Sequence, residues 1–132
     1  MTKKIIKVVG AAIIKEEKVL AMQRSEQMTL PGMWEFPGGK VEADETEQEA
    51  LIREIKEELN VTINILDYIN EASYDYDFGT VQLKVYTAEI ISGQIALEEH
   101  SDGKWVTADE LKNIDWAPVD IPAAKALVKV LG

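Results

Sequence analysis

A single helical segment constrains this chain more than any other part of the sequence. Residues 46–59 are predicted to form a helix, and at about 100° per residue the side chains of Glu54, Glu57 and Glu58 fall within one sector of it. The adjacent sector is apolar and consists of Leu51, Ile52, Ile55 and Leu59. The helix is therefore expected to pack one stripe against a core and to gather carboxylates on the next.

The acidic stripe is unfavourable unless a cation lies among its carboxylates, because like charges repel. Oxygen ligands suit hard ions such as magnesium, calcium or manganese. Arg53 offers a partial alternative, since Glu49, Arg53 and Glu57 are spaced four residues apart and can form a ladder of ion pairs. Such surface pairs contribute only about 0.3–0.5 kcal/mol each, so they leave the repulsion at Glu54 and Glu58 in place. The alternative without a metal is a solvated helix face in an acidic protein.

The stretch from Gly39 to Val61 resembles the Nudix box. That pattern has a glycine, five residues, Glu, seven residues, Arg-Glu, an aliphatic, any residue, Glu-Glu, any residue, a glycine and an aliphatic. The matching residues are Gly39, Glu45, Arg53, Glu54, Ile55, Glu57, Glu58 and Val61. Asn60 stands where the pattern has its second glycine. This position follows the helix end, where a left-handed backbone is needed, and Asn tolerates that conformation well, so we expect Asn60 to preserve the turn.

Strands and further helices are predicted around this helix from apolar patterns and turn signals. The expected strands cover residues 4–14, 18–24, 61–74, 80–91 and 104–106, and the further helices cover 108–112 and 121–131. Residues 25–44 are rich in Pro and Gly and are expected to form a loop, and Ser92-Gly93 a turn. This arrangement predicts an α/β (α+β) fold with a mixed sheet between helices. The resemblance implies the same Nudix-like α/β/α sandwich, formed by a single domain over residues 1–132.

Composition narrows the class of protein. The 132 residues suffice for one domain with a buried core. Because the chain has no Cys, disulfides, thiolate zinc sites and a cysteine nucleophile are excluded. A formal net charge of −10 argues against binding polymeric DNA or RNA, since phosphate contacts need Lys and Arg. The apolar run 5–14 is too short and too charged for a membrane span or a signal peptide, so we expect a soluble cytoplasmic protein, monomeric or homodimeric, with no membrane partner.

The segment that precedes the helix also resembles the MutT branch of the Nudix family, and it reads Trp34-Glu35-Phe36-Pro37-Gly38-Gly39-Lys40. Its glycines let the backbone approach a metal or phosphate, and Lys40 adds a donor beside them. By the resemblance, Gly38 supplies a carbonyl ligand to the metal, and Arg24, at the end of a predicted strand, contacts a phosphate. Trp34 and Phe36 could flank a base, although such a pair is at least as typical of a core. The alternative for the glycines is a tight turn with an exposed Lys.

Two further acidic residues enter through the resemblance. Aligned on Trp105, the MutT pattern places an additional loop carboxylate at Glu99, which would bind a metal or position the attacking water. If the alignment is shifted by one residue, this carboxylate is Glu98. Asp120 occupies the place of a base-reading Asn in MutT, while a branch resembling bacterial CTP pyrophosphohydrolases carries the Val-Asp-Ile-Pro form seen here. A carboxylate there could accept hydrogen bonds from the amine of cytosine, or from N1 and N2 of a guanine-type base. An N-cap for the last helix is the alternative.

The resemblance implies a hydrolase dependent on Mg²⁺, or Mn²⁺, that cleaves a nucleoside triphosphate into the monophosphate and pyrophosphate. Its role would be to clear oxidised or modified nucleotides of the 8-oxo-dGTP or (d)CTP type. The implied metal ligands are Gly38, Glu54, Glu57, Glu58 and Glu99, supported by Arg53 and Glu45. Two alternatives stay open: a Nudix hydrolase of ADP-ribose or a dinucleotide, and a non-catalytic acidic protein that binds metal. The intact set of glutamates favours the enzyme.

Overall fold

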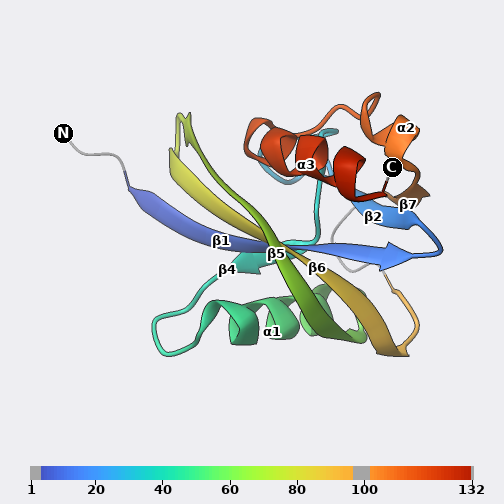
Figure 1. The fold of residues 1–132 in the computed structure, drawn as a ribbon. Helices are drawn as coiled ribbons and strands as arrows, with labels where there is room; N and C mark the ends of the chain where they lie inside the picture. The colour runs from blue at the N-terminus through green and yellow to red at the C-terminus, as the bar shows by residue number, and fades with distance from the viewer. Residues whose placement is uncertain (1–3, 97–101, 132) are drawn as a thin grey trace.

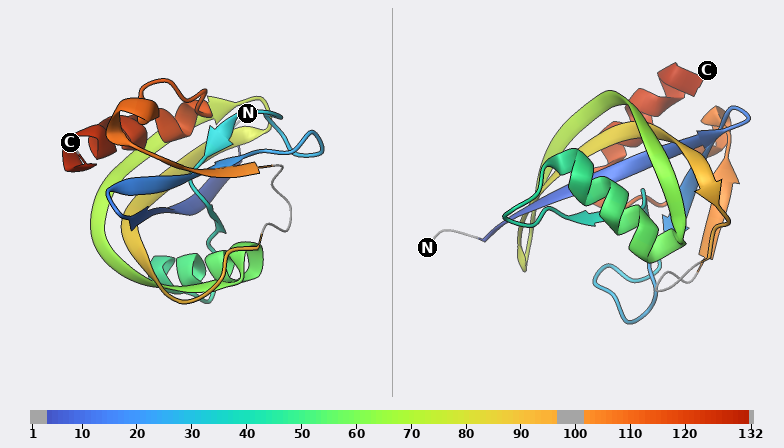
Figure 2. Two further views of the ribbon diagram at one scale, coloured as in Figure 1. Left: turned by 90° about the vertical axis from the view of Figure 1, so that its right-hand side faces the viewer. Right: turned by 90° about the horizontal axis from the view of Figure 1, so that it is seen from below.

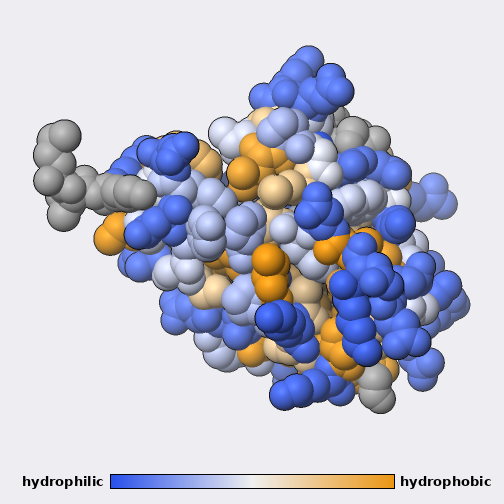
Figure 3. Space-filling view, turned by 90° about the horizontal axis from the view of Figure 1, so that it is seen from above, coloured by the Kyte–Doolittle hydropathy of each residue, from blue (hydrophilic) through white to orange (hydrophobic). Residues whose placement is uncertain are grey.

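The structure, a computed structural model, describes residues 4–96 and 102–131. Helix α1 (Glu47–Leu59) lies beneath a twisted sheet, and α2 (Ala108–Leu111) and α3 (Ile121–Leu131) lie above it (Figure 1). The predicted α/β/α sandwich with a mixed sheet is confirmed. Seen from above, the surface carries separate hydrophobic spots among hydrophilic side chains (Figure 3). Within the described residues, no helix has both the length and the apolar character needed to cross a lipid bilayer.

The sheet has seven strands in the described part of the chain. They are β1 (Ile5–Lys15), β2 (Lys18–Gln23), β3 (Trp34–Glu35), β4 (Gly38–Lys40), β5 (Val61–Tyr76), β6 (Gly79–Gly93) and β7 (Asp102–Val106). The strand order is β3-β2-β1-β6-β5, with β4 paired to β1 and β7 paired to β2. β1 runs parallel to β6, and the other pairs are antiparallel, which makes the sheet mixed.

Alternate residues of β1 face opposite layers, as the two-residue period of a strand requires. Val9, Ala11 and Ile13 belong to the buried cluster that includes the apolar side chains of α1. Ala12 belongs to the cluster on the other face, together with Leu127 of α3. Each face of the sheet is therefore closed by a different helix, and the long β5–β6 hairpin wraps around one side of the sandwich (Figure 2).

The ends of α1 follow from local sequence. The Thr46 hydroxyl accepts the backbone N–H of Glu49, and the Glu49 carboxylate accepts the N–H of Thr46, so the pair forms a capping box. At the other end, Asn60 is left-handed with φ of 62° and donates its N–H to the carbonyl of Lys56. The predicted role of Asn60 is confirmed. Because Glu49 is engaged in the cap and the ion pairs of Arg53 go to other carboxylates, the predicted Glu49–Arg53 rung is wrong.

The buried arc of α1 is displaced from the predicted one. Its buried residues are Ala50, Leu51, Ile55 and Leu59. Around the helix, Glu54 and Glu58 lie between Ala50 and Leu51, so the carboxylates are partly inside the arc. Ile52 lies beyond Leu59 and is 39% exposed, so its predicted place in the core is wrong.

Residues 25–44 are not wholly a loop, contrary to the prediction. β3 pairs with β2 through Met22↔Glu35, and β4 pairs with β1 through Gly10↔Gly38. Each short strand pairs with a longer strand, and this tertiary pairing outweighs the local preference of the Pro and Gly residues for a loop. The predicted turn at Ser92-Gly93 is also wrong, because both residues remain in β6 and pair with the start of β5.

Candidate active site

A cavity of about 470 Å³ is lined by the end of α1, by β4, and by the short 3₁₀ turn η1 (Pro118–Asp120) that precedes α3. Six of the residues singled out in the sequence line it: Arg24, Phe36, Gly38, Lys40, Glu58 and Asp120. These residues are far apart in the chain. The fold therefore brings Gly38 and Glu58, two of the predicted metal ligands, to one cavity with Phe36 and Asp120, whereas Glu54 and Glu57 are not among its lining residues.

Arg53 organises the carboxylates of the Nudix box. Its Nη2 and Nε donate to the two oxygens of Glu45 at 2.6 and 3.1 Å, and its Nη1 donates to Glu54 at 2.8 Å and to Glu57 at 3.3 Å. A fifth hydrogen bond goes from Nη2 to the backbone carbonyl of Lys40 at 3.1 Å. The hydrogen bonds from Arg53 lower the pKa of Glu45, and those same bonds raise the pKa of the guanidinium. Arg53 thus ties α1 to the segment that leads into it.

Glu54 is held directly beneath the glycine segment. A Cβ added to Gly39 would overlap the carboxylate of Glu54, and a Cβ added to Gly38 would overlap the backbone of Val9 and Gly10. Burial raises the pKa of Glu54, while the hydrogen bond from Arg53 opposes that shift. Both glycines therefore lie in a strand and pack closely on two different neighbours, so the tight turn of the alternative is wrong, while Lys40 is exposed as that alternative expected.

The donor set suits a hard divalent cation. Glu58 lines the same cavity as Gly38, and Oε2 of Glu58 is shielded from solvent. Carboxylate and carbonyl oxygens of this kind are ligands that Mg²⁺ and Mn²⁺ prefer. Among residues 4–96 and 102–131, no three acidic or histidine side chains are grouped closely enough to hold a metal ion, and one oxygen each of Glu54 and Glu57 bonds to Arg53. Glu99, the predicted loop ligand, lies outside the described residues.

Asp120 is 4% exposed and lines the cavity. Its Oδ1 accepts the backbone N–H of Phe36 at 3.2 Å. Burial and then the charge of Glu35 raise the pKa of Asp120 well above its usual value, while the bond from Phe36 and the charge of Arg24 oppose the shift. The carboxyl group therefore bonds across to the segment between β3 and β4 and not to the backbone of α3, so the capping interpretation is wrong.

Aromatic rings form part of the cavity wall. Phe36 is 4% exposed and stacks on Trp116 with ring centroids 4.6 Å apart. Trp34 is not among the lining residues; Lys104 lies over its ring, with Nζ 5.5 Å from the centroid. The structure therefore brings Phe36 to the cavity without Trp34.

Sequence reasoning missed two aromatic residues of this wall, Tyr76 and Phe78. Their rings are stacked with centroids 5.1 Å apart, and both line the cavity. The Tyr76 hydroxyl also accepts the N–H of Val119 at 3.1 Å, which fixes η1. The available signal was the aromatic residue at every second position, Tyr74, Tyr76 and Phe78, before Gly79; Tyr76 ends β5, and Phe78 lies in the turn that follows.

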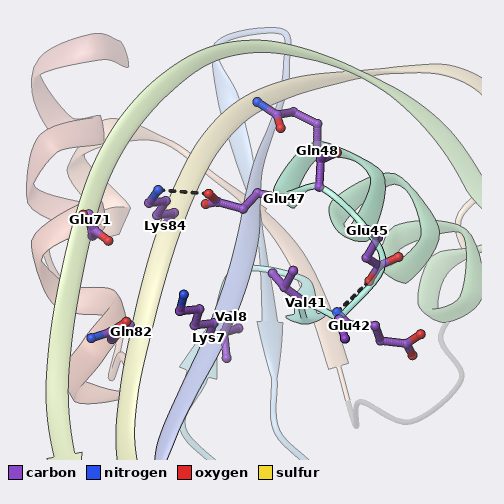
Figure 4. A pocket seen from close by; sticks show the side chains of 12 residues that line it. Lys7, Val8, Val41, Glu42, Glu45, Glu47, Gln48, Glu71, Gln82 and Lys84 are labelled. Atoms are coloured by element: carbon purple, nitrogen blue, oxygen red, sulfur yellow. Dashed lines mark hydrogen bonds and ion pairs between the residues drawn. The ribbon is translucent and has the colours of Figure 1, made fainter.

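A second hollow, of about 610 Å³, lies between the start of α1 and the sheet (Figure 4). Lys84 crosses it to Glu47 at 3.0 Å, a contact that raises the pKa of Lys84. Carboxylates outnumber cations in its lining, which includes Glu42, Glu45, Glu47 and Glu71 against Lys7 and Lys84. This hollow is larger, but Gly38, Glu58 and Asp120 line the smaller cavity and not this one, so the smaller cavity is the candidate active site.

Residues 4–127 match the family model described as NUDIX domain. The chain belongs to the NUDIX family. Among relatives of this Nudix protein, the CTP pyrophosphohydrolase of Escherichia coli K12 is 34% identical over 125 residues, covering 95% of this chain and 93% of the relative. The 8-oxo-dGTP diphosphatase of Haemophilus influenzae is 31% identical over 122 residues, covering 91% and 89%. A solution structure titled DNA mismatch repair protein MutT, from methicillin-resistant Staphylococcus aureus 252, is 46% identical with a TM-score of 0.80, covering 98% of this chain and 99% of that one.

Proposed function

We propose that this Nudix enzyme hydrolyses a nucleoside triphosphate to the monophosphate and pyrophosphate, with Mg²⁺ as its metal and Mn²⁺ as a substitute. Its substrates are modified nucleotides of the 8-oxo-dGTP or (d)CTP type. The observation that carries the proposal is a single cavity lined both by Glu58 and Gly38, which belong to the phosphate chemistry, and by the buried Asp120, which suits a base.

The phosphate end relies on the residues around α1. A divalent metal held by Gly38 and the glutamates of α1 would neutralise phosphate charge and lower the pKa of a bound water. Lys40 lines the cavity and adds positive charge there. Ion pairs with Arg53 hold the carboxylates of Glu54 and Glu57 in place. In the reaction, the oxygen of a water molecule bonds to phosphorus, the P–O bond of the anhydride breaks and pyrophosphate leaves. The proton of the water passes to a carboxylate of the site, for which Glu99 is one candidate.

The base end relies on Asp120 and the apolar wall. Phe36, Tyr76 and Phe78 offer rings against which a base can pack. The charged form of Asp120 accepts hydrogen bonds from the cytosine amine or from a guanine-type base, and its neutral form, which burial favours, also donates one. The names of the two relatives, a CTP pyrophosphohydrolase and an 8-oxo-dGTP diphosphatase, support these two substrate types.

The test is pyrophosphate release with Mg²⁺ from 8-oxo-dGTP, dCTP, 5-methyl-dCTP, CTP, dGTP and ADP-ribose. We expect the modified or cytosine nucleotides to be the best substrates, and Asp120→Asn to change the order of preference among bases. Turnover of ADP-ribose alone would favour the second Nudix activity. Metal binding with no turnover of any nucleotide would refute the assignment as an enzyme and favour the alternative of a non-catalytic metal-binding protein.

A further inference from the structure

The loop between β2 and β3, residues 24–33, projects from the sheet (Figure 2). Four of its residues line the cavity, so the loop forms one wall of it. Within this loop, the residues that line the cavity are Arg24, Met28, Thr29 and Leu30. Leu30 has φ of 53°, a left-handed conformation that leucine rarely adopts. A loop that holds such a residue needs contacts from outside its own backbone to keep its shape.

Arg24 supplies those contacts. Its Nε donates to the carbonyl of Thr29, and its Nη2 donates to the Thr29 hydroxyl at 2.8 Å. On the opposite side its Nη1 bonds Oε1 of Glu35 at 2.6 Å, which joins the loop to β3. The side chains of Arg24 and Glu35 are 17% and 19% exposed. The planar fork of an arginine can hold two partners at fixed angles, which a lysine cannot do.

The backbone of Arg24 completes the arrangement. Its carbonyl accepts the N–H of Gly32 at 2.9 Å, and its N–H donates to the carbonyl of Met33 at 2.8 Å. The base and the tip of the loop are therefore both fastened to this one residue.

We propose that Arg24 is a positioning residue, which clamps the 24–33 loop as a wall of the cavity and orients Glu35. The significance of this wall for the nucleotide rests on the proposed function, whereas the clamp itself does not. Loss of the clamp loosens the wall that faces the base and leaves the α1 carboxylates unchanged.

The first test is hydrogen exchange of the nucleotide-free protein. In Arg24→Ala we expect the amides of Gly32 and Met33 to exchange at least about tenfold faster, with the β1–β6 amides unchanged. Thr29→Val, which removes one acceptor, should show a smaller increase, and Lys15→Ala, which removes an exposed charge elsewhere, should show none. Unchanged loop exchange in both Arg24→Ala and Thr29→Val would overturn the clamp. If Arg24→Ala does not fold, hydrogen exchange of the loop amides in Arg24→Lys and Thr29→Val tests the clamp in its place.

The second test separates a clamp from a phosphate ligand. We expect Arg24→Ala and Thr29→Val to raise KM for the nucleotide with little change in kcat, and to leave inhibition by inorganic pyrophosphate unchanged. Weaker pyrophosphate inhibition in Arg24→Ala, with Thr29→Val equal to wild type, would show phosphate binding and overturn the proposal. If wild-type protein turns over none of the nucleotides, the proposed function fails, and the exchange experiment still decides the clamp.

Discussion

The adjacent glycines of β4 should respond to the same substitution in opposite ways. In Gly39→Ala the new Cβ meets the end of the Glu54 side chain, which can rotate away, whereas in Gly38→Ala it meets the backbone of β1, which cannot. We therefore expect Gly39→Ala to lose activity with the fold largely kept, and Gly38→Ala to be destabilised much more strongly.

The structure sets the size of each effect. When Glu54 rotates, it gives up its 2.8 Å bond to Arg53, and the two side chains are 17% and 26% exposed. A hydrogen bond between charged groups contributes about 1.5–3 kcal/mol, and because solvent reaches this pair we expect a cost of about 1–2 kcal/mol. In a domain of this size that cost lowers Tm by about 3–8 °C. Forcing β4 away from β1 in Gly38→Ala should cost about 3 kcal/mol or more, the upper end of overpacking.

The assay is thermal unfolding by circular dichroism together with turnover of the best nucleotide. Displacing Glu54 should lower turnover by about 10²-fold in Gly39→Ala. Gly10→Ala is the matched control, because its Cβ would lie at ordinary contact distances, 3.4 Å or more from Leu83 and other neighbours. Wild-type turnover in Gly39→Ala, or a Gly38→Ala protein as stable as Gly39→Ala, would refute this account of the packing.

Three further predictions follow from the site and the core. Glu57→Gln should lower turnover by orders of magnitude with an unchanged Tm, because Glu57 is 59% exposed and its pair with Arg53 contributes only about 0.3–0.5 kcal/mol; retained turnover would contradict its assignment. The pKa of Asp120 is raised in the folded protein, so the stability that its neutral form contributes is complete below the unfolded pKa of 3.8 and is lost as pH rises through the folded pKa. In guanidinium unfolding, Asp120→Asn should therefore be more stable than wild type at pH 8 and should lose this advantage towards pH 4. An equal difference in stability at both pH values would refute this prediction. Chelating the divalent metal should abolish turnover and leave the circular dichroism spectrum unchanged, with activity restored by Mg²⁺; turnover in EDTA would exclude a metal-dependent reaction.

Local signals in the sequence predicted the elements that depend on local contacts. The ends of α1 are set by Thr46 and Asn60, within the helix's own turns, and both ends were predictable. The run of Ile, Val and Ala in β1 likewise predicted a strand. The short strands β3 and β4 were not predictable, because two or three residues carry too little pattern and their pairing depends on the edges of β1 and β2.

Within the site, sequence spacing placed the glutamates in one sector but could not distinguish their environments. Glu54 is 17% exposed and Glu57 is 59% exposed, because the sheet and β4 cover only one side of the acidic stripe. The environment of Asp120 was equally hidden, since its hydrogen-bond partner, Phe36, is 84 residues away in the chain. Residues that act through such long-range contacts require the fold before their roles can be separated.

The glycine pair shows how the sandwich and the chemistry depend on the same close approach. β4 can lie against β1 only because Gly38 has no side chain, and this contact brings Gly39 over Glu54. Arg53 then bonds both Glu54 and the carbonyl of Lys40, so α1 is fixed to β4 at the point where the carboxylates lie. A change that widens the gap between β1 and β4 would therefore move the carboxylates of α1 relative to the cavity, even though it touches none of them.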